Sequence, residues 1–265
     1  MSATPAGERL PRGVLPLAGA GVLFVVLPLL GLVLRAPWGD LWTELAAPEV
    51  RVALRLSLLC SVAATTLSVV LGLPLAWVQA RLEFPGRGVL RGLTLLPIVL
   101  PPVVGGVALL TAFGRRGVLG QWLDLGFGVQ LPFTTAGAVL AEAFVAMPFF
   151  VLAAEGALRG VDGRLEDAAR TLGARPWRVF LAVTLPLARP SLLAGAVLCW
   201  ARALGEFGAT ITFAGNFPGR TQTVPLAVYL LLESRPQAGI ALSLVLVVVS
   251  LAVLVALRDR WLQTR

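Results

Sequence analysis

The residues of this chain that could do chemistry are charged, and they gather in two segments of an otherwise apolar sequence. The first segment, 164–190, reads RLEDAARTLGARPWRVFLAVTLPLARP and sets arginines and acids between two apolar runs. The second segment, 200–229, contains Arg202 and Glu206, which stand four residues apart and can pair on one face of a helix. Charges within a membrane-spanning helix cost at least about 2.5–3.5 kcal/mol each, so such a pair points to a function.

The composition excludes several kinds of catalytic and metal site. The chain has no histidine, which removes the Ser–His–Asp and Cys–His nucleophile systems and the H-E-x-x-H zinc helix. Its two cysteines, Cys60 and Cys199, fall in apolar runs and lack the spacing of a disulfide framework or a metal site. The sequence also contains no G-x-x-x-x-G-K-[ST] phosphate-binding loop. We therefore predict no catalytic residue, no bound cofactor and no metal site in this chain.

The apolar content predicts an all-α protein that crosses a membrane several times. Hydrophobic residues make up 57% of the 265 and charged residues only 14%, too few to cover a soluble domain. Several apolar runs reach the roughly 18–20 residues that cross a ~30 Å hydrocarbon core. Six spans are predicted, at 13–34, 52–78, 89–113, 134–158, 191–214 and 238–257.

Two features interrupt this pattern. Pro97, Pro101 and Pro102 should distort the third span, because proline lacks the N–H that a helix interior needs. The polar segments 114–133 and 215–235 should form loops on one side of the membrane, the first with room for a short helix.

The arginines predict the orientation of the spans. The net charge of +8 comes from arginine alone, because the chain has no lysine. With both termini in the cytoplasm, roughly twice as many arginines lie on the cytoplasmic side as outside. This places 1–12, the loop 159–190 and the tail 259–265 in the cytoplasm, and makes 52–258 the main transmembrane domain. Nucleic-acid binding is disfavoured because no basic patch is interleaved with exposed aromatic residues.

Periodicity predicts a helix at the start of the first segment. Asp162 is placed to cap its N-terminus, and Glu166 and Asp167 lie near the positive end of its dipole. One face of this helix carries apolar residues at i, i+3, i+4 and i+7, namely Leu165, Ala168, Ala169 and Leu172.

A second short helix should follow a glycine corner. Gly173 fits a helix C-terminus and Pro176 the first turn of the next helix, which we expect Leu185–Pro186 to end. One face of this second helix carries Trp177, Phe180, Leu181 and Thr184. Two interpretations remain open: a docking element whose small residues let a partner approach closely, or a basic interfacial loop that only fixes topology.

The same segment resembles the EAA signature of the membrane subunits of ABC importers. Asp167-Ala168-Ala169 is followed after three residues by Gly173, after nine more by Val183, and after one more by Leu185-Pro186. The family pattern has Glu in place of Asp167 and Ile in place of Val183, with the same spacing. The resemblance implies the type I ABC-importer fold with six transmembrane helices, in the cytoplasmic membrane of a bacterium or archaeon.

In that family the loop is a coupling helix that inserts into a groove of a separate ATP-binding subunit. The resemblance therefore implies as partners two ATP-binding subunits, a second copy of this chain and an extracytoplasmic substrate-binding protein. ATP and magnesium would be held by the ATP-binding subunits, and this chain would hydrolyse no ATP. The residues assigned to this contact are Glu166, Asp167, Ala168, Ala169, Gly173, Ala174, Trp177, Phe180, Leu185 and Pro186.

The second segment is similar to the membrane subunits of molybdate importers. ALGEFGATITFAGN and PGRTQTVPLAVY follow that subgroup's pattern, as does LLPIVLPPVVGGVALL at 95–110, and the sulfate/thiosulfate subgroup carries a looser relative. The resemblance implies import of a tetrahedral oxyanion, molybdate or tungstate ahead of sulfate. The residues expected along the translocation pathway or at its gate are Arg202, Gly205, Glu206, Thr210, Thr212, Asn216, Pro101 and Pro102.

Several alternatives remain open. The Arg202–Glu206 pair could lock two helices instead of gating a pathway, and Glu142 in the fourth span is expected to pair or cap within the bundle. An ion-coupled carrier working alone would need acids deep in several spans and repeated halves, which the sequence lacks. An intramembrane enzyme is disfavoured by the absence of histidine and of paired intramembrane aspartates.

Overall fold

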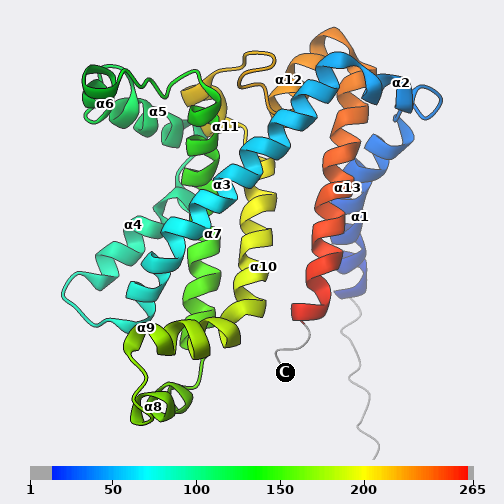
Figure 1. Cartoon of the computed structure of the whole chain (residues 1–265). Helices are drawn as coiled ribbons and strands as arrows, with labels where there is room; N and C mark the ends of the chain where they lie inside the picture. The colour runs from blue at the N-terminus through cyan, green and yellow to red at the C-terminus, as the bar shows by residue number, and fades with distance from the viewer. Residues whose placement is uncertain (1–13, 262–265) are drawn as a thin grey trace, which may run out of the picture.

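The computed structural model describes residues 14–261, and every regular element in this range is a helix (Figure 1). The predicted segment 1–12 and the last four residues of the predicted tail lie outside the described residues. The helices are α1 (Val14–Leu34), α2 (Leu41–Ala46), α3 (Pro48–Arg81), α4 (Arg87–Val99), α5 (Pro102–Phe113), α6 (Gly120–Phe127), α7 (Thr135–Arg159), α8 (Gly163–Thr171), α9 (Pro176–Val179), the π-helical turn η1 (Phe180–Thr184), α10 (Leu185–Leu204), α11 (Gly208–Ala214), α12 (Val224–Ser234) and α13 (Pro236–Trp261).

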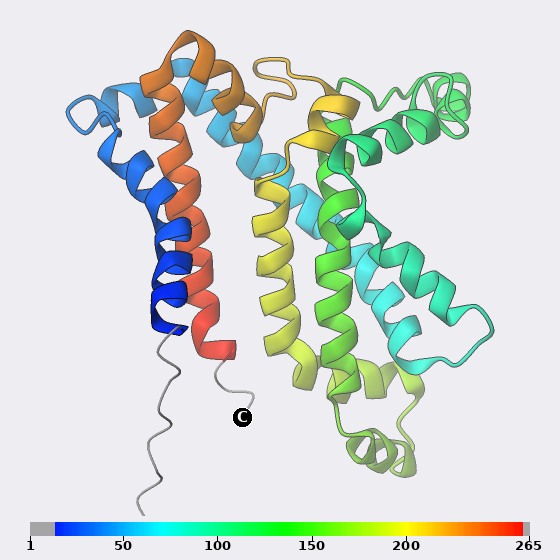
Figure 2. The ribbon, with the colours of Figure 1, turned by 180° about the vertical axis from the view of Figure 1, so that it is seen from behind.

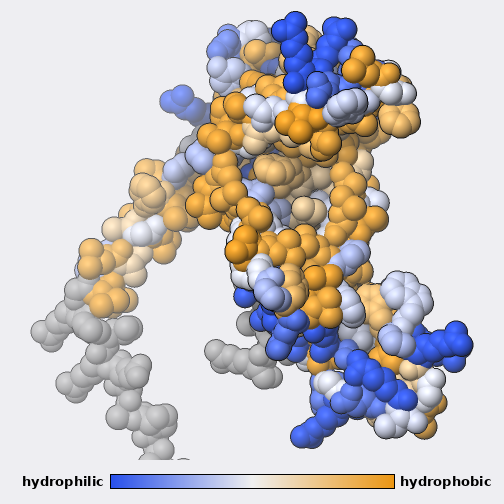
Figure 3. All heavy atoms as spheres, turned by 90° about the vertical axis from the view of Figure 1, so that its left-hand side faces the viewer, coloured by the Kyte–Doolittle hydropathy of each residue, from blue (hydrophilic) through white to orange (hydrophobic). Residues whose placement is uncertain are grey.

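Five of the described helices are long and apolar enough to cross a membrane. They are α1, α3, α7, the continuous helix Pro176–Leu204 and the apolar part of α13, Pro236–Ala256. A sixth span exists only if α4 and α5 are counted together. Apolar side chains cover the middle of the surface and hydrophilic ones gather at its two ends (Figure 3), as expected for a multi-pass membrane protein.

The predicted third span, 89–113, is not a single straight helix. It forms α4 and α5, and the helix axis bends by 119° between them. Leu100 and Pro101 have extended backbones at the corner, and Pro102 begins α5 in the first-turn position that tolerates a missing N–H. We expected proline to distort this span. The pair Pro101–Pro102 instead divides it into two separate helices.

The predicted fifth span, 191–214, is wrong at both ends. Its helix begins at Pro176, because Leu185–Pro186 does not end the second helix of the loop. The π-helical turn η1 shifts the hydrogen bonding, so that the N–H of Leu185 bonds to Phe180 O and the helix continues through Pro186. At its other end the helix stops at Leu204, and after a break at 205–207 the short helix α11 follows.

The end of the molecule opposite α8 carries α2, α6 and α12 (Figure 1). Helix α6 lies in the predicted loop 114–133, whereas α12 fills most of the segment 215–235 that we expected to be a loop. Arg235, between α12 and α13, forms ion pairs with Glu44 at 2.6 Å and with Glu49, tying this corner to α2 and α3. On α6, a hydrogen bond from Gln130 and the nearby Arg115 guanidinium lower the pKa of Asp124.

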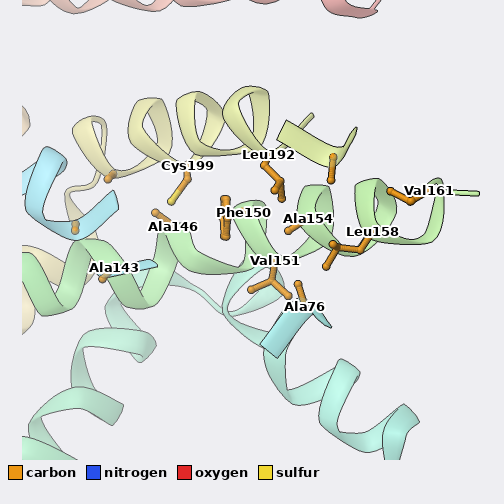
Figure 4. Packing of buried hydrophobic residues seen from close by; sticks show 13 residues of the cluster. Ala76, Ala143, Ala146, Phe150, Val151, Ala154, Leu158, Val161, Leu192 and Cys199 are labelled. Carbon is orange, nitrogen blue, oxygen red and sulfur yellow. The ribbon is translucent and has the colours of Figure 1, made fainter. Parts of the chain in front are cut away.

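Helix α7 is the centre of the packing. Its buried face contacts α3 on one side and α10 on the other, and most of the side chains between them are small. Figure 4 shows Phe150 of α7 directed toward α10, where Leu192 and Cys199 surround it. Gly72 of α3 lies against Phe150, where an added Cβ would be 3.0 Å from the ring, so the helices approach closely.

Helix α1 stands apart from this bundle. It runs beside α13 (Figure 2), yet none of its residues is buried. A helix that is apolar on all sides and uncovered in the single chain must face lipid or another protein chain.

We expect Gly195→Leu to destabilise the contact between α7 and α10. A Cβ at Gly195 would lie 2.7 Å from the Cβ of Ala153, an atom fixed by its backbone. Overpacking of this kind costs about 1–3 kcal/mol, so the midpoint of thermal unfolding in detergent should fall. Gly156→Leu on the exposed face of α7, where no atom lies within 4 Å, is the control and should leave the midpoint almost unchanged. Equal midpoints for the two variants would contradict this packing.

Candidate functional site

The first corner of the candidate docking loop has the structure that its sequence predicts. The side chain of Asp162 accepts a hydrogen bond from the N–H of Arg164 at 2.9 Å and so caps α8. Gly173 has φ +83°, the left-handed conformation that ends a helix and that other residues adopt only with strain. Pro176 then opens α9 in its first turn. The loop thus presents α8 at a fixed angle beyond the ends of the long helices (Figure 1).

The outward side of this corner is apolar and uncovered. Leu172 is 89% exposed and Trp177 is 69% exposed, and Leu165 and Leu181 are also exposed. A hollow of about 820 Å³ lies beside them, lined by Gly173, Arg175, Trp177, Arg178, Leu181 and Ala182. Large exposed apolar side chains around a hollow, with arginines at its edge, are typical of a protein-binding surface.

Most of the predicted docking residues lie on or near this surface. Asp167, Ala168 and Gly173 are exposed, Ala169 and Ala174 are half-buried, and Pro186 is exposed further along the chain. Phe180 and Leu185 are half-buried, and the ring of Phe180 stacks on Trp177 with 5.5 Å between the ring centroids.

Glu166 differs from the other predicted docking residues because it is buried within the chain. Its Oε1 is 2.7 Å from Arg81 Nη2 and also accepts a hydrogen bond from the hydroxyl of Thr184 at 2.7 Å. Its Oε2 lies 3.7 Å from Arg170 Nη2. This carboxylate therefore faces α3 and η1.

A second polar cluster lies nearby, at the ends of α3, α4 and α7, and it was not predicted from the sequence. Glu155 pairs with Arg159 at 2.6 Å and with Arg91 of α4 at 3.2 Å. Buried Gln79 donates to the hydroxyl of Thr94 at 2.8 Å. Only the i, i+4 spacing of Glu155 and Arg159 was visible in the sequence, since the other contacts join separate helices.

Within the membrane region, Arg202 and Glu206 form the predicted pair, with 2.6 Å between Nη2 and Oε2. Glu206 is only 1% exposed, and it belongs to the break after α10 and not to a continuous helix. Its Oε1 accepts a hydrogen bond from the N–H of Ala209 at 2.9 Å, which satisfies one of the free donors at the start of α11. One carboxylate thus joins the two halves of the broken helix.

The two helix breaks pack against each other through α5 and α11. A Cβ on Gly106 would lie 2.5 Å from Cβ of Thr212, and a Cβ on Gly208 would lie 2.7 Å from Cβ of Pro102. Side chains larger than hydrogen at these two positions would push α5 and α11 apart. The structure therefore brings Pro102 and Thr212 into one contact region, although 110 residues separate them in the sequence.

The other predicted pathway residues differ in their burial and in their hydrogen-bond partners. Thr210 is fully buried on α11, and its hydroxyl has no hydrogen-bond partner within residues 14–261. Asn216 lies after α11 and donates to Leu226 O at 3.3 Å. Gly205 and Pro101 are exposed at the two breaks. Because α10 ends at Leu204, the small residues Ala201, Gly205 and Ala209 do not lie along one continuous helix.

Glu142 was expected to pair or cap within the bundle, and the described residues provide no ion pair for it. It is 1% exposed on α7, and within the described chain its Oε2 has no hydrogen-bond partner and no arginine forms an ion pair with it. Cys60 and Cys199 are buried free thiols, as predicted for core residues. In the described part of the chain no group of three or more His, Cys, Asp or Glu residues could hold a metal ion.

The geometry is that of a helical membrane transport component: broken helices inside the membrane and an exposed loop outside it. Residues 51–265 match the family described as "Binding-protein-dependent transport system inner membrane component". The chain belongs to this family and is a transport subunit, not an enzyme.

Two groups of relatives resemble the chain over most of its length. The "Molybdenum transport system permease protein ModB" of Mycobacterium tuberculosis (strain ATCC 25618 / H37Rv) is 48% identical over 253 residues, 95% of each chain. The protein of the same name from Escherichia coli (strain K12) is 47% identical over 210 residues, 79% of this chain and 92% of that one. The "Sulfate transport system permease protein CysT" of Escherichia coli (strain K12) is 36% identical over 237 residues, covering 86% and 85%.

Solved structures support the fold. A bacterial ABC transporter that imports the acidic polysaccharide alginate matches with a TM-score of 0.73, at 18% identity, over 95% of this chain and 94% of that one. An amino acid ABC transporter matches with a TM-score of 0.57, at 20% identity, over 80% and 94%. The type I ABC-importer fold that the sequence predicts is confirmed.

We expect Arg202→Ala to destabilise the protein more than Arg202→Ala combined with Glu206→Gln. The single change leaves a buried carboxylate without its cation, which costs about 3–5 kcal/mol. The double variant removes the charge, while the carbonyl of the new side-chain amide can still accept the N–H of Ala209. Thermal unfolding midpoints in detergent measure the difference. The control is Arg115→Ala, which breaks the exposed pair with Asp124 of α6 and should leave the midpoint almost unchanged. A double variant less stable than the single one would show that the pair is not a buried ion pair.

Proposed function

We propose that the chain is the permease subunit of an ATP-driven importer that carries an oxyanion, molybdate or tungstate, into the cell. It would work as a homodimer with two separate ATP-binding subunits and an external substrate-binding protein. The observation that carries the proposal is the 48% identity over 95% of both chains to a permease named for molybdenum transport. Sulfate is the second candidate substrate, because a sulfate permease is 36% identical over 86% of this chain.

The proposed contact with the ATP-binding subunit is the corner formed by α8 and α9. The exposed apolar side chains Leu165, Leu172 and Trp177 surround it, and the adjacent hollow is edged by Arg175 and Arg178. A surface of this size and apolar character is costly to leave in water, so a partner that covers it would bind there. The sequence itself has no phosphate-binding loop, which agrees with ATP and magnesium being held by another chain.

The proposed translocation pathway runs along the contact region of α5 and α11. Broken helices are tolerated inside a membrane where they are buried in protein or line a wet cavity. The described chain leaves Pro101, Val103, Val104 and Val107 of this region exposed. A second copy placed around a two-fold axis would cover these residues and enclose the pathway between the two subunits.

The proposed orientation puts α8 in the cytoplasm. The start of α1, the end of α13 and α8 lie at the same end of the molecule (Figures 1 and 2). This arrangement supports a cytoplasmic location for both termini, because arginines are more numerous at that end.

The proposed function is tested by purifying the tagged chain gently from its native membrane. We expect a stoichiometric ATP-binding protein to co-purify, with ATPase activity that rises when a binding protein loaded with molybdate is added. The same assay with sulfate or tungstate decides the substrate. Recovery of the chain alone, with uptake driven by an ion gradient in vesicles, would overturn the proposal in favour of a secondary carrier.

We expect Gly173→Val to separate ATP hydrolysis from transport. The left-handed backbone at this corner costs roughly 1–2 kcal/mol for a residue with a Cβ, so the angle between α8 and α9 should change. Uptake into proteoliposomes should fall by about tenfold, equivalent to ~1.4 kcal/mol, while ATPase activity persists. Gly126→Val, on the exposed face of α6 where nothing lies within 4 Å, is the control. Unchanged uptake by the Gly173 variant would remove the docking role.

A further inference from the structure

Helix α8 is attached to the rest of the chain through an acid. Of its nine residues, from Gly163 to Thr171, Glu166 is the only one that is buried. Apolar side chains usually hold an amphipathic helix to a protein, but on α8 Leu165 is 49% exposed, Ala168 is exposed and Ala169 is half-buried. A buried carboxylate is stable only when partners compensate its charge, so the attachment of α8 depends on the partners of Glu166.

Those partners come from two long helices. Arg81 is the last residue of α3, and its guanidinium lies 2.7 Å from Glu166 Oε1. Thr184 is the last residue of the π-helical turn η1 and donates to the same oxygen at 2.7 Å. Both contacts are short, and the one to Arg81 is a charge-assisted hydrogen bond, the stronger class of such interactions.

Each partner belongs to an element that reaches the membrane region. After Thr184 the chain enters α10, which runs to Leu204 and the break that Glu206 bridges. On α3, the carbonyl of Gln79 accepts hydrogen bonds from Arg87 at 3.0 Å and from Arg159 of α7 at 3.3 Å, so this end of α3 is fixed to its neighbours. A displacement of α8 therefore acts first on η1 and on the end of α3.

We propose that Glu166 is a positioning residue that transmits the movement of α8 to α10 and α3, and that it makes no contact with the ATP-binding subunit. This inference rests on the proposed function, in which α8 is the docking element. The adjacent acid, Asp167, is in the opposite situation: its side chain is 71% exposed and it pairs with Arg170 of the same helix at 2.7 Å. The two neighbouring acids of the signature segment thus have separate roles, one internal and one external.

The π-helical turn supports this assignment. Turns of this kind are rare and are frequently found at functional sites. Here the turn lies between the corner at Gly173 and the start of α10, and the hydroxyl that ends it bonds to Glu166. If the helix bends at η1, the part before η1 can change its angle to α10 while Glu166 keeps α8 attached to α3 and η1.

The test uses the complete importer in proteoliposomes, with its ATP-binding subunits and loaded binding protein, and measures molybdate taken up per ATP hydrolysed. Glu166→Gln keeps the shape of the side chain and removes the charge that Arg81 needs. We expect the complex to assemble normally and to hydrolyse at least about fivefold more ATP per molybdate imported. Asp124→Asn, the same acid-to-amide change at an ion-paired acid of α6, is the matched control and should leave the ratio unchanged.

A double-mutant cycle tests whether Glu166 acts through Arg81. Arg81→Gln alone should raise the ATP cost per molybdate in the same direction, and adding Glu166→Gln should increase it little further, because both changes remove one shared contact. Additive effects, or a cost unchanged in Glu166→Gln, would overturn the inference. If Glu166→Gln does not assemble, the comparison of Arg81→Lys with Arg81→Gln replaces it: the lysine variant should retain coupling, and equal costs would overturn the inference.

The two proposals fail in different ways. A wild-type chain that binds no ATP-binding subunit overturns both the proposed function and the role of Glu166. The positioning role alone is overturned if the wild-type importer works and Glu166→Gln changes neither the ATP hydrolysed per molybdate imported nor the contact with the ATP-binding subunit. If crosslinking instead joins position 166 directly to the ATP-binding subunit, Glu166 is a docking residue and not a positioning residue.

Discussion

The architecture depends on the requirement that backbone N–H and C=O groups inside a membrane find partners within the protein. The chain breaks its helices twice at membrane depth, at Leu100–Pro101 and at 205–207. Glu206 accepts the N–H of Ala209 at the second break, and its charge is balanced by Arg202. Each break also lies close to the other through the α5–α11 contact.

The helices differ in how closely they pack against one another. Helices α3, α7 and α10 pack through small residues at close range, and a tightly packed interior transmits displacement with little deformation. Helices α4 and α5 meet at a sharp corner and have most of their apolar side chains exposed. A rotation of α10 would displace the break that follows it. There Glu206 connects α10 to α11, and α11 contacts α5. The fold thus contains a continuous physical connection from the corner at Gly173 to the broken helices.

The sequence predicted the straight helices well because their apolar runs are long and their ends are marked by local signals. The expected spans 52–78 and 134–158 correspond closely to α3 and α7, and Asp162, Gly173 and Pro176 act at helix ends as expected. The predicted helix ends are wrong where other contacts outweigh the local sequence signal. Pro186 does not end a helix, because the π-helical turn before it removes the need for its N–H. Conversely, the segment 205–207 breaks a helix although it contains no proline. Gly205 is the C-cap of α10, and Glu206 caps the start of α11.

The candidate site shows the same limit at the level of single side chains. The pair Arg202–Glu206 was predictable because both residues lie four apart on one chain segment. The pair Arg81–Glu166 was not, because 85 residues separate its members and each alone resembles an ordinary charge at a helix end. A sequence signature identifies the functional segment. It does not show which way each side chain faces, because successive residues of a helix point about 100° apart. Glu166 and Asp167 therefore face opposite environments, and only the packing of α8 against α3 and η1 decides which acid is internal.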